Sequence, residues 1–241
     1  MGCAGPAVTA RFYNPRTGMW LTRDPQADDY KEYFPYVFCA GNPVNLVDPE
    51  GRKLYYAKGS SSVFKIKFAE AVRIMNEKGT SYNLAKLDQS DQVYFIQEAS
   101  PEGNKFDPNT LTIKWDPSKV SYDDQTGLLR SPLTTLAHEA GHANQYDEAV
   151  KNDSLDRFIA SIHAGDKQYG SKEEKRNITT TEQYAARRHG EIRGTQVTRY
   201  DHKGERYPGK LPDFSKMTMQ QILYYVIETN RIQGSIVVDK K

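Results

Sequence analysis

Apolar side chains recur at helical spacing between residues 61 and 79, where the set consists of Phe64, Phe68, Val72 and Met75. Serines that can cap a helix precede this set and Gly79 follows it, so the pattern predicts one helix with both ends marked. Two later runs, residues 92–99 and 110–117, are typical of strands. In the second run apolar and polar residues alternate, which predicts a strand with one buried face.

The C-terminal half is predicted to be mainly helical. Pro132 suits a first helical turn, and an amphipathic pattern continues from there to about Val150. The other predicted elements are helices over residues 153–163, from residue 179 or 180 to 193 and from 218 onward, a polar loop between the first two, and a short strand at 235–238. Together with the strands above, these elements predict an α+β domain with a small mixed sheet over residues 53–241.

Residues 1–52 differ in amino-acid composition from the rest of the chain. Proline, glycine, asparagine and aspartate separate short aromatic runs, which is typical of turns and short strands. Five prolines recur at nearly even intervals, at positions 15, 25, 35, 43 and 49, and exclude any long helix. We therefore expect a proline-rich arm of β or extended structure, separate from the α+β domain.

Charge and composition exclude several classes of protein. The net charge is only +2, from 33 Lys and Arg against 31 Asp and Glu, so the footprint of a nucleic-acid or membrane-binding protein is missing. The sequence shows no apolar run of 18 residues and no signal peptide of its own. Its two cysteines, Cys3 and Cys39, cannot form a disulfide framework or a cysteine-type zinc site.

The most informative motif is His138-Glu139-Ala140-Gly141-His142 on the helix predicted from Pro132. Residues four apart lie on one helical face, so the two imidazoles can bind a single metal ion. Glu139 would then lie beside that ion without binding it, and in this motif such a glutamate accepts the proton of the reacting water. The sequence therefore predicts a zinc site with Glu139 as the catalytic residue. Ala140 and Gly141 are small, which leaves room for another element to pack closely.

A catalytic zinc ion needs a third protein ligand and an open position. A third histidine six residues after His142 is excluded because Glu148 is there. The downstream candidates are His163, Glu173, Glu174, Glu182, His189, Glu191 and His202. Glu182 and His189 are seven residues apart on one predicted helix and share a face, so either could reach the metal.

The N-terminal arm resembles the end of the RHS/YD-repeat core that precedes the toxin tip of bacterial polymorphic toxins. The matching pieces, in order, are Arg11-Phe12-Tyr13-Asn14-Pro15, Thr17-Gly18, Asp24-Pro25, Tyr36, Asn42-Pro43-Val44-Asn45 and Asp48-Pro49-Glu50-Gly51. The resemblance implies that residues 1–52 are the tail of such a core. It also implies that residues 53–241 are a secreted or delivered effector domain, with an immunity protein as a possible partner.

Residues 110–200 resemble zincins of the gluzincin type, and more closely the NleD-like metallopeptidase tips of RHS toxins. In that family a downstream helix carries Glu-x-x-Ala followed by Ile-Arg, and here Glu182-Gln-Tyr-Ala185 and Ile192-Arg193 stand at matching offsets. His189 and Gly190 replace an acid and an amide of the family pattern. The resemblance implies a zincin-like fold with His138, His142 and Glu182 as zinc ligands, and His189 as a rival ligand or a supporting residue.

These features predict a zinc-dependent endopeptidase that cleaves protein or peptide substrates. Tyr146, Arg193, Tyr200 and His202 are candidates for stabilising the oxyanion, and residues 110–116 are the strand expected to pair with the substrate. The alternative is a non-catalytic, RHS-derived binding fragment with a structural or degenerate zinc site. A nuclease tip would require a basic surface, which the nearly balanced charge does not support.

Overall fold

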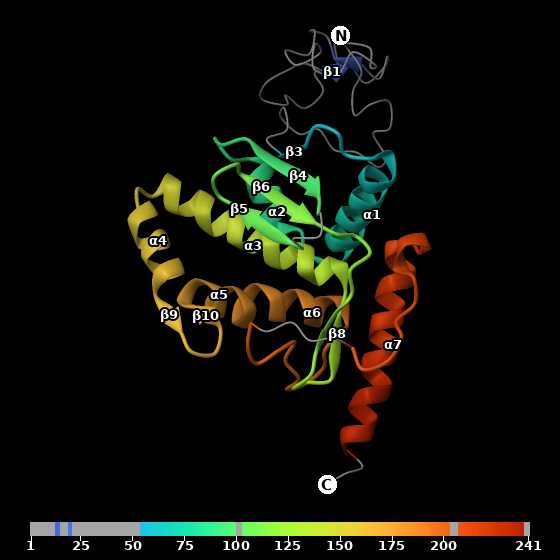
Figure 1. The fold of residues 1–241 in the computed structure, drawn as a ribbon. Coiled ribbons are helices and arrows are strands. Elements are labelled where there is room, and N and C mark those ends of the chain that lie inside the picture. Colours follow the sequence, from blue (N-terminus) through green and yellow to red (C-terminus); the bar gives the residue numbers. More distant parts are fainter. Residues whose placement is uncertain (1–12, 15–18, 21–53, 100–102, 203–206, 239–241) are drawn as a thin grey trace, which may run out of the picture. The chain divides into compact units, whose positions relative to one another are not determined.

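The computed structural model describes residues 13–14, 19–20, 54–99, 103–202 and 207–238 (Figure 1). The chain divides into two compact units, Met1–Lys53 and Leu54–Lys241. In the first unit the described residues are an antiparallel pair, β1 (Tyr13–Asn14) and β2 (Met19–Trp20). The rest of the expected arm, with most of the RHS-like motif and both cysteines, lies outside the described residues.

The first helix of the second unit, α1 (Ser62–Lys78), has the predicted ends. The side chain of Ser61 accepts a hydrogen bond from the backbone N–H of Phe64 at the N-terminus, and Gly79 is left-handed (φ 69°) at the C-terminus. A left-handed backbone favours glycine because it has no Cβ. A short helix that the pattern did not indicate, α2 (Tyr82–Asp88), follows directly.

A four-stranded mixed sheet lies beside α1 (Figure 1). Its order is β3 (Leu54–Tyr56), β4 (Tyr94–Glu98), β6 (Thr112–Trp115) and β5 (Lys105–Asp107). The first three strands are parallel and β5 is antiparallel to β6. The strands predicted over residues 92–99 and 110–117 are therefore the central pair, β4 and β6, and both present buried residues to the core.

The hydrophobic core joins the sheet to α1 and to the long helix α3 (Pro132–Lys151). Trp115 on β6 is fully buried, packs against Phe64 and Phe68 of α1, and donates an indole hydrogen bond to the carbonyl of Pro132 at 2.8 Å. This one side chain thus fixes the start of α3 relative to the sheet. Ser131 caps the helix by accepting from the backbone N–H of Thr134.

The remaining helices and strands complete the second unit. They are the hairpin β7 (Ser121–Asp123) and β8 (Leu128–Arg130), the helix α4 (Leu155–His163), the hairpin β9 (Gly165–Asp166) and β10 (Gly170–Ser171), the helix α5 (Lys172–Asn177), the π-helix η2 (Ile178–Glu182), the helix α6 (Gln183–His189), the 3₁₀ turn η3 (Phe214–Lys216) and the helix α7 (Met219–Val238). The second unit is α+β. No helix of the described residues is long and apolar enough to cross a membrane.

Two sequence predictions were wrong here. The polar loop expected before residue 179 contains β9, β10 and α5, and the helix expected from residue 179 or 180 begins at Lys172 and ends at His189. Its N-terminal turn carries almost no apolar residue, so periodicity did not indicate it, although Ser171 caps it through Glu174. Residues 235–238, expected as a strand, continue α7.

The segment from α5 to η2 crosses α3 very closely at Gly141. A Cβ on Gly141 would overlap Asn177 Oδ1 and would stand 3.0 Å from Thr181 Cγ2. Asn177, which is fully buried, also donates through Nδ2 to the carbonyl of His138 at 2.8 Å. The small residue inside the motif is therefore required by this crossing, as the sequence indicated.

Replacing Gly141 with alanine is expected to lower the free energy of unfolding. Overpacking a tight contact costs about 1–3 kcal/mol, which exceeds the roughly 1 kcal/mol that alanine gains over glycine in a helix. Chemical denaturation of Gly141→Ala measures the difference. In an Asn177→Ala background, where the overlapping oxygen is gone, the same substitution should cost less. A Gly141→Ala protein that is more stable than the wild type would contradict the close crossing.

Candidate metal centre

The helix α3 presents His138 and His142 on one face, as their spacing predicts. The two imidazole rings are nearly perpendicular, with centroids 4.6 Å apart, and their Nε2 atoms lie 2.9 Å from each other. His138 is 5% exposed, and the side chain of His142 is only slightly more accessible. The structure thus holds two ring nitrogens within the reach of one ion.

Glu174 of α5 supplies a carboxylate at the same point. Its Oε1 lies 3.2 Å from His138 Nε2, and its Oε2 lies 3.1 Å from His142 Nε2. Each of the three residues offers a donor atom, and these atoms all lie within 4.8 Å of one another. The group His138, His142 and Glu174 could therefore hold a metal ion.

The other ring nitrogen of each histidine faces a different carboxylate. His142 Nδ1 is 2.7 Å from Glu173 Oε1, and His138 Nδ1 is 3.0 Å from Glu182 Oε2. A carboxylate at Nδ1 favours the tautomer that keeps the Nε2 lone pair free, which is the arrangement found around metal-binding histidines. Both imidazoles are thus oriented to present Nε2 to the same point.

Glu182 was expected as the third ligand, but the structure does not place it in the group that could hold an ion. Its carboxylate is buried between Arg130 at 3.1 Å and Arg199 at 2.6 Å, and it also accepts from Thr198 at 2.5 Å. Burial alone would raise the pKa of Glu182, but the two guanidinium groups hold that pKa well below its ordinary value. Glu182 therefore lies behind His138, and Glu174 takes the position expected for it.

Glu139 differs from the other carboxylates of the site. It is 7% exposed, and no hydrogen bond or ion pair of its side chain is found among the described residues. Its charge nevertheless raises the pKa of His142, so the group lies close to that imidazole. A buried carboxylate beside the site without a fixed partner is available to exchange protons.

The charges around the histidines favour a cation. Glu139, Glu173, Glu174 and Glu182 act on the two imidazoles. Among the described residues, the guanidinium groups that contact these carboxylates are those of Arg130 and Arg199. With neutral imidazoles, four carboxylates against two guanidinium groups leave two negative charges in a buried region. A divalent cation would balance this excess, as would protonation of both histidines.

The pKa values respond to the same excess of negative charge. Burial lowers the pKa of His142, but its hydrogen bonds to Glu173 and Glu174 outweigh burial and raise that pKa to about 10. The pKa of His138 is also raised, because Glu174 and Glu182 outweigh burial and the repulsion from His142. The pKa of Glu174 lies well below its ordinary value despite burial, owing to its histidine contacts.

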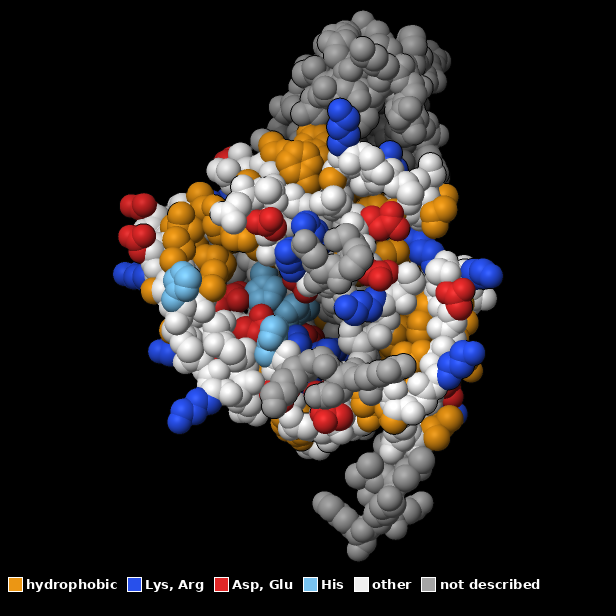
Figure 2. All heavy atoms as spheres, viewed as in Figure 1, with side chains coloured by type: hydrophobic (Ala, Val, Ile, Leu, Met, Phe, Trp, Pro, Cys, Tyr) orange, Lys and Arg blue, Asp and Glu red, His pale blue; other side chains and the backbone are white. Residues whose placement is uncertain are grey.

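Two histidines and one glutamate form a ligand set of catalytic zinc sites, which keep a further position open. Glu174 Oε1 is buried and has no hydrogen-bond partner with suitable geometry among the described residues, so an acceptor atom is left over at the centre of the group. The residues present therefore fit a divalent metal ion. Figure 2 shows histidine side chains in a hollow of this face.

The remaining candidates lie elsewhere or act indirectly. His189 is buried away from this group, where its ring nitrogens contact Thr80 and Thr134 at 2.8 Å. Glu191 is buried beside it and accepts from Ser131 and Thr134. These contacts fix the start of α3 to α6 and contribute no ligand. His163 is exposed at the end of α4.

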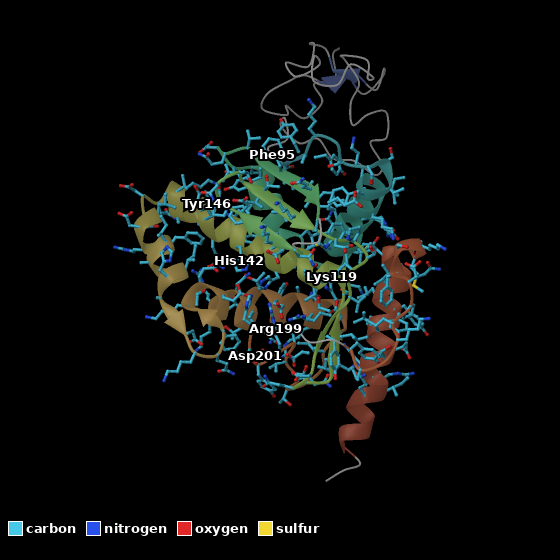
Figure 3. All side chains as sticks on the ribbon, in the orientation of Figure 1. Phe95, Lys119, His142, Tyr146, Arg199 and Asp201 are labelled. Atoms are coloured by element: carbon cyan, nitrogen blue, oxygen red, sulfur yellow. The ribbon has the colours of Figure 1, made fainter. Side chains whose placement is uncertain are left out.

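Among the residues suggested for stabilising an oxyanion, His202 lies nearest the centre. Its Nε2 is 3.2 Å from Glu174 Oε1, and its side chain is 57% exposed. Tyr146 lies one turn beyond His142 and is seen close to it in Figure 3. Tyr200 is 48% exposed and Arg193 is exposed, and neither contacts the group among the described residues.

The strand predicted to pair with the substrate cannot do so. Residues 112–115 form β6, which is hydrogen-bonded to β4 on one side and to β5 on the other. Both of its edges are therefore used within the sheet. The edge of the sheet nearest α3 is β5 (Lys105–Asp107), whose only partner among the described strands is β6.

Glu174 was one of seven candidates in the sequence and was not preferred. The signal that could have selected it is the pattern Ser171-x-x-Glu174, which marks the start of a helix. Placing α5 there would have put Glu173 and Glu174 on the segment that crosses α3.

The chain matches no protein-family model, and no curated protein or solved structure resembles it significantly. The resemblance to RHS cores and to metallopeptidase tips therefore stays a prediction from sequence motifs. What the site can do is argued below from its own geometry.

Removing Glu174 is expected to reduce metal uptake more than removing Glu182. Zinc affinity, measured by competition with a chromogenic chelator, should fall to background for Glu174→Ala because a donor is lost. For Glu182→Gln it should fall about 10–100-fold, because only the orientation of His138 is affected.

His189→Ala is the control for the rival ligand and should retain stoichiometric zinc wherever it folds. Circular dichroism of each protein separates unfolding from loss of the site. Full zinc affinity in Glu174→Ala, together with loss in Glu182→Ala, would instead restore Glu182 as the third ligand.

Proposed function

We propose that the unit Leu54–Lys241 is a zinc-dependent endopeptidase. The observation that carries this proposal is the convergence of His138 Nε2, His142 Nε2 and the Glu174 carboxylate, with the unpartnered carboxylate of Glu139 beside them. A purely structural metal site has no use for such a base. The proposal replaces Glu182 with Glu174 as the third ligand of the expected zinc site.

The chemistry divides between the ion and the chain. When bound, zinc would polarise a substrate carbonyl and make a nearby water molecule more acidic. Glu139 would accept the proton of the attacking water and pass it to the amine that leaves when the peptide bond breaks. His202, whose Nε2 is 3.2 Å from Glu174 Oε1, and Tyr146, one turn beyond His142, would be the candidates to contact the substrate carbonyl oxygen.

The carboxylates behind the histidines would hold the ligands in place. Glu173 receives His142 Nδ1, and Glu182 faces His138 Nδ1 while Arg130 and Arg199 fix it. Side chains held in this way need no rearrangement on binding, so the site is preorganised. The arrangement supports catalysis better than the alternative of a degenerate metal site.

A zincin-like fold for this unit is part of the same proposal. It is supported by a mixed sheet with an antiparallel edge strand, β5, that packs next to the helix carrying the motif. An extended peptide could add to β5 as a further strand, because β5 is the last strand in the order of the sheet. This role moves from β6, where the sequence placed it, to β5.

The biological setting that we propose is that of an effector tip of a bacterial RHS polymorphic toxin. Support comes from the ordered motifs between Arg11 and Gly51 and from the metallopeptidase-like motifs downstream. In this setting the substrate is a protein of the target cell, and an immunity protein would bind the unit in the producing cell.

The substitution Glu139→Gln should abolish cleavage while leaving metal binding intact. Loss of a general base lowers rates by typically 10²–10⁴-fold, and glutamine keeps the size of the side chain. Cleavage of an unfolded protein such as reduced casein can be followed by electrophoresis and mass spectrometry. Zinc content should be the same in variant and wild type.

Glu148→Gln is a matched control, since Glu148 is a partly exposed glutamate of the same helix whose ion pair among the described residues is with Lys86 at 3.8 Å. It should cleave like the wild type. If Glu139→Gln, loaded with zinc, were as active as the wild type, Glu139 would not be the base. If zinc-loaded wild type cleaved no protein offered, including a library of denatured bacterial proteins, the endopeptidase proposal would fail.

A further inference from the structure

The helix α4 carries an apolar face that the fold does not bury. Its apolar residues Leu155, Phe158, Ile159 and Ile162 follow helical spacing, yet none of its side chains is buried. Ile159 is 42% exposed and Ile162 is 39% exposed. An amphipathic helix normally turns its apolar stripe to the core, so an exposed stripe indicates a surface that binds something apolar.

Aromatic rings connect this face to the metal centre. Phe158 packs edge-on against Tyr146 with ring centroids 5.7 Å apart, and Tyr146 packs against Phe106 at 5.9 Å. Tyr146 follows His142 by one turn of α3, and Phe106 belongs to the edge strand β5. The apolar surface therefore extends from the outer face of α4 to the strand edge and to the metal-binding helix.

The surface view agrees with these contacts. Figure 2 shows an apolar patch directly beside the hollow that contains the histidines, and Figure 3 shows Tyr146 between α4 and the labelled His142. We call the patch formed by Phe106, Tyr146, Phe158, Ile159 and Ile162 the apolar shelf.

The floor of the shelf is fixed, whereas its rim is open. Phe106 and Tyr146 are partly buried and belong to a chain of rings that continues to fully buried Tyr94, with centroids of Phe106 and Tyr94 6.2 Å apart. The two isoleucines at the rim make no such contact and keep about two fifths of their surface exposed. A rigid aromatic floor with an open aliphatic rim can receive one apolar side chain at little entropic cost.

We propose that the apolar shelf is the subsite that selects a large aliphatic or aromatic residue of the substrate next to the scissile bond. This inference rests on the proposed endopeptidase function and names its substrate class. The occupant is a side chain of a peptide bound at the metal centre, because the shelf is continuous with both the metal-binding helix and the β5 edge. Tyr146 and Phe158 are in direct ring contact within the shelf, so the shelf offers apolar contact to a substrate side chain.

The test uses metal-binding probes and needs no knowledge of the natural substrate. Hydroxamates of N-acetyl-leucine and N-acetyl-alanine have the same chelating group and differ only in the side chain. Isothermal titration calorimetry of each probe is carried out on the zinc-loaded full chain. The leucine probe is expected to bind about tenfold more tightly, the lower end of what a hydrophobic subsite gains from added methylene groups.

Variants locate the origin of that preference. Ile159→Ser combined with Ile162→Ser should bring the affinity ratio of the two probes close to one, while the affinity for the alanine probe stays unchanged. Ile66→Ser is the matched control, because Ile66 is an isoleucine of α1 with 68% exposure outside the shelf. It should keep the wild-type ratio.

The outcomes separate this inference from the function on which it rests. Equal affinity for both probes in the wild type, or a leucine preference that survives the double serine substitution, would overturn the shelf as a subsite and leave the metal centre in place. Failure of both probes to bind zinc-loaded protein would instead count against the open metal site, and both proposals would then fall. Peptides that differ only in leucine or alanine at one position repeat the comparison as kcat/KM.

Discussion

The geometry of the site depends on the close crossing of two segments at Gly141. The segment from α5 to η2 approaches the backbone of α3 so nearly that no side chain fits between them, and Asn177 ties it to the carbonyl of His138. Within the part of the chain that the structure describes, the carboxylates that face the two histidines from outside α3 all lie on this segment, namely Glu173, Glu174 and Glu182. If the crossing were wider, the same residues would be present but would not reach the imidazoles. The π-helical turn at residues 178–182 changes the helical phase, and it is Glu182 at its end that faces Arg130 and Arg199.

This crossing concentrates charge, and charge explains why the three carboxylates have different roles. Glu182 is neutralised by two guanidinium groups, so it is a fixed carboxylate behind His138 and has little left to offer an ion. Glu174 has only one long contact to a guanidinium, 3.5 Å to Arg199, and otherwise faces histidines. Burying an uncompensated carboxylate is costly. The site is therefore balanced when a divalent cation or two protons lie between Glu174 and the imidazoles, and these alternatives compete for the same Nε2 atoms.

Sequence patterns predicted the residues on α3 and failed where long-range packing decides. The offset of four between His138 and His142 is a local property of a helix, and the caps of α1 and the start of α3 at Pro132 are equally local, so all of these were predictable. The choice between Glu174 and Glu182 was harder to predict. The cap at Ser171 could have placed Glu174 on a helical segment, but the contacts that neutralise Glu182 are long-range ones to two arginines. Those arginines come from β8 and from the loop after α6, and nothing in the sequence spacing joins Arg130 to Arg199. The RHS-like arm is a prediction of another kind, since its residues lie almost wholly outside those described.

Some carboxylates of the site contact a histidine and Glu139 does not, and this difference explains how they could have different roles. Glu173 and Glu182 each face a ring nitrogen, so moving either would disturb a histidine, and they are suited to positioning. Glu139 comes from the same helix as the histidines but has no such contact among the described residues, which is the reason that the proposed function gives it the part of the base. The surface around the histidines also differs between its two sides. On the side of α4 the contacts are apolar and the face is open, whereas on the side of Arg199 the groups are charged and already paired. A peptide lying across the histidines would therefore find apolar contact on one side only, and this difference would set both its direction and its position.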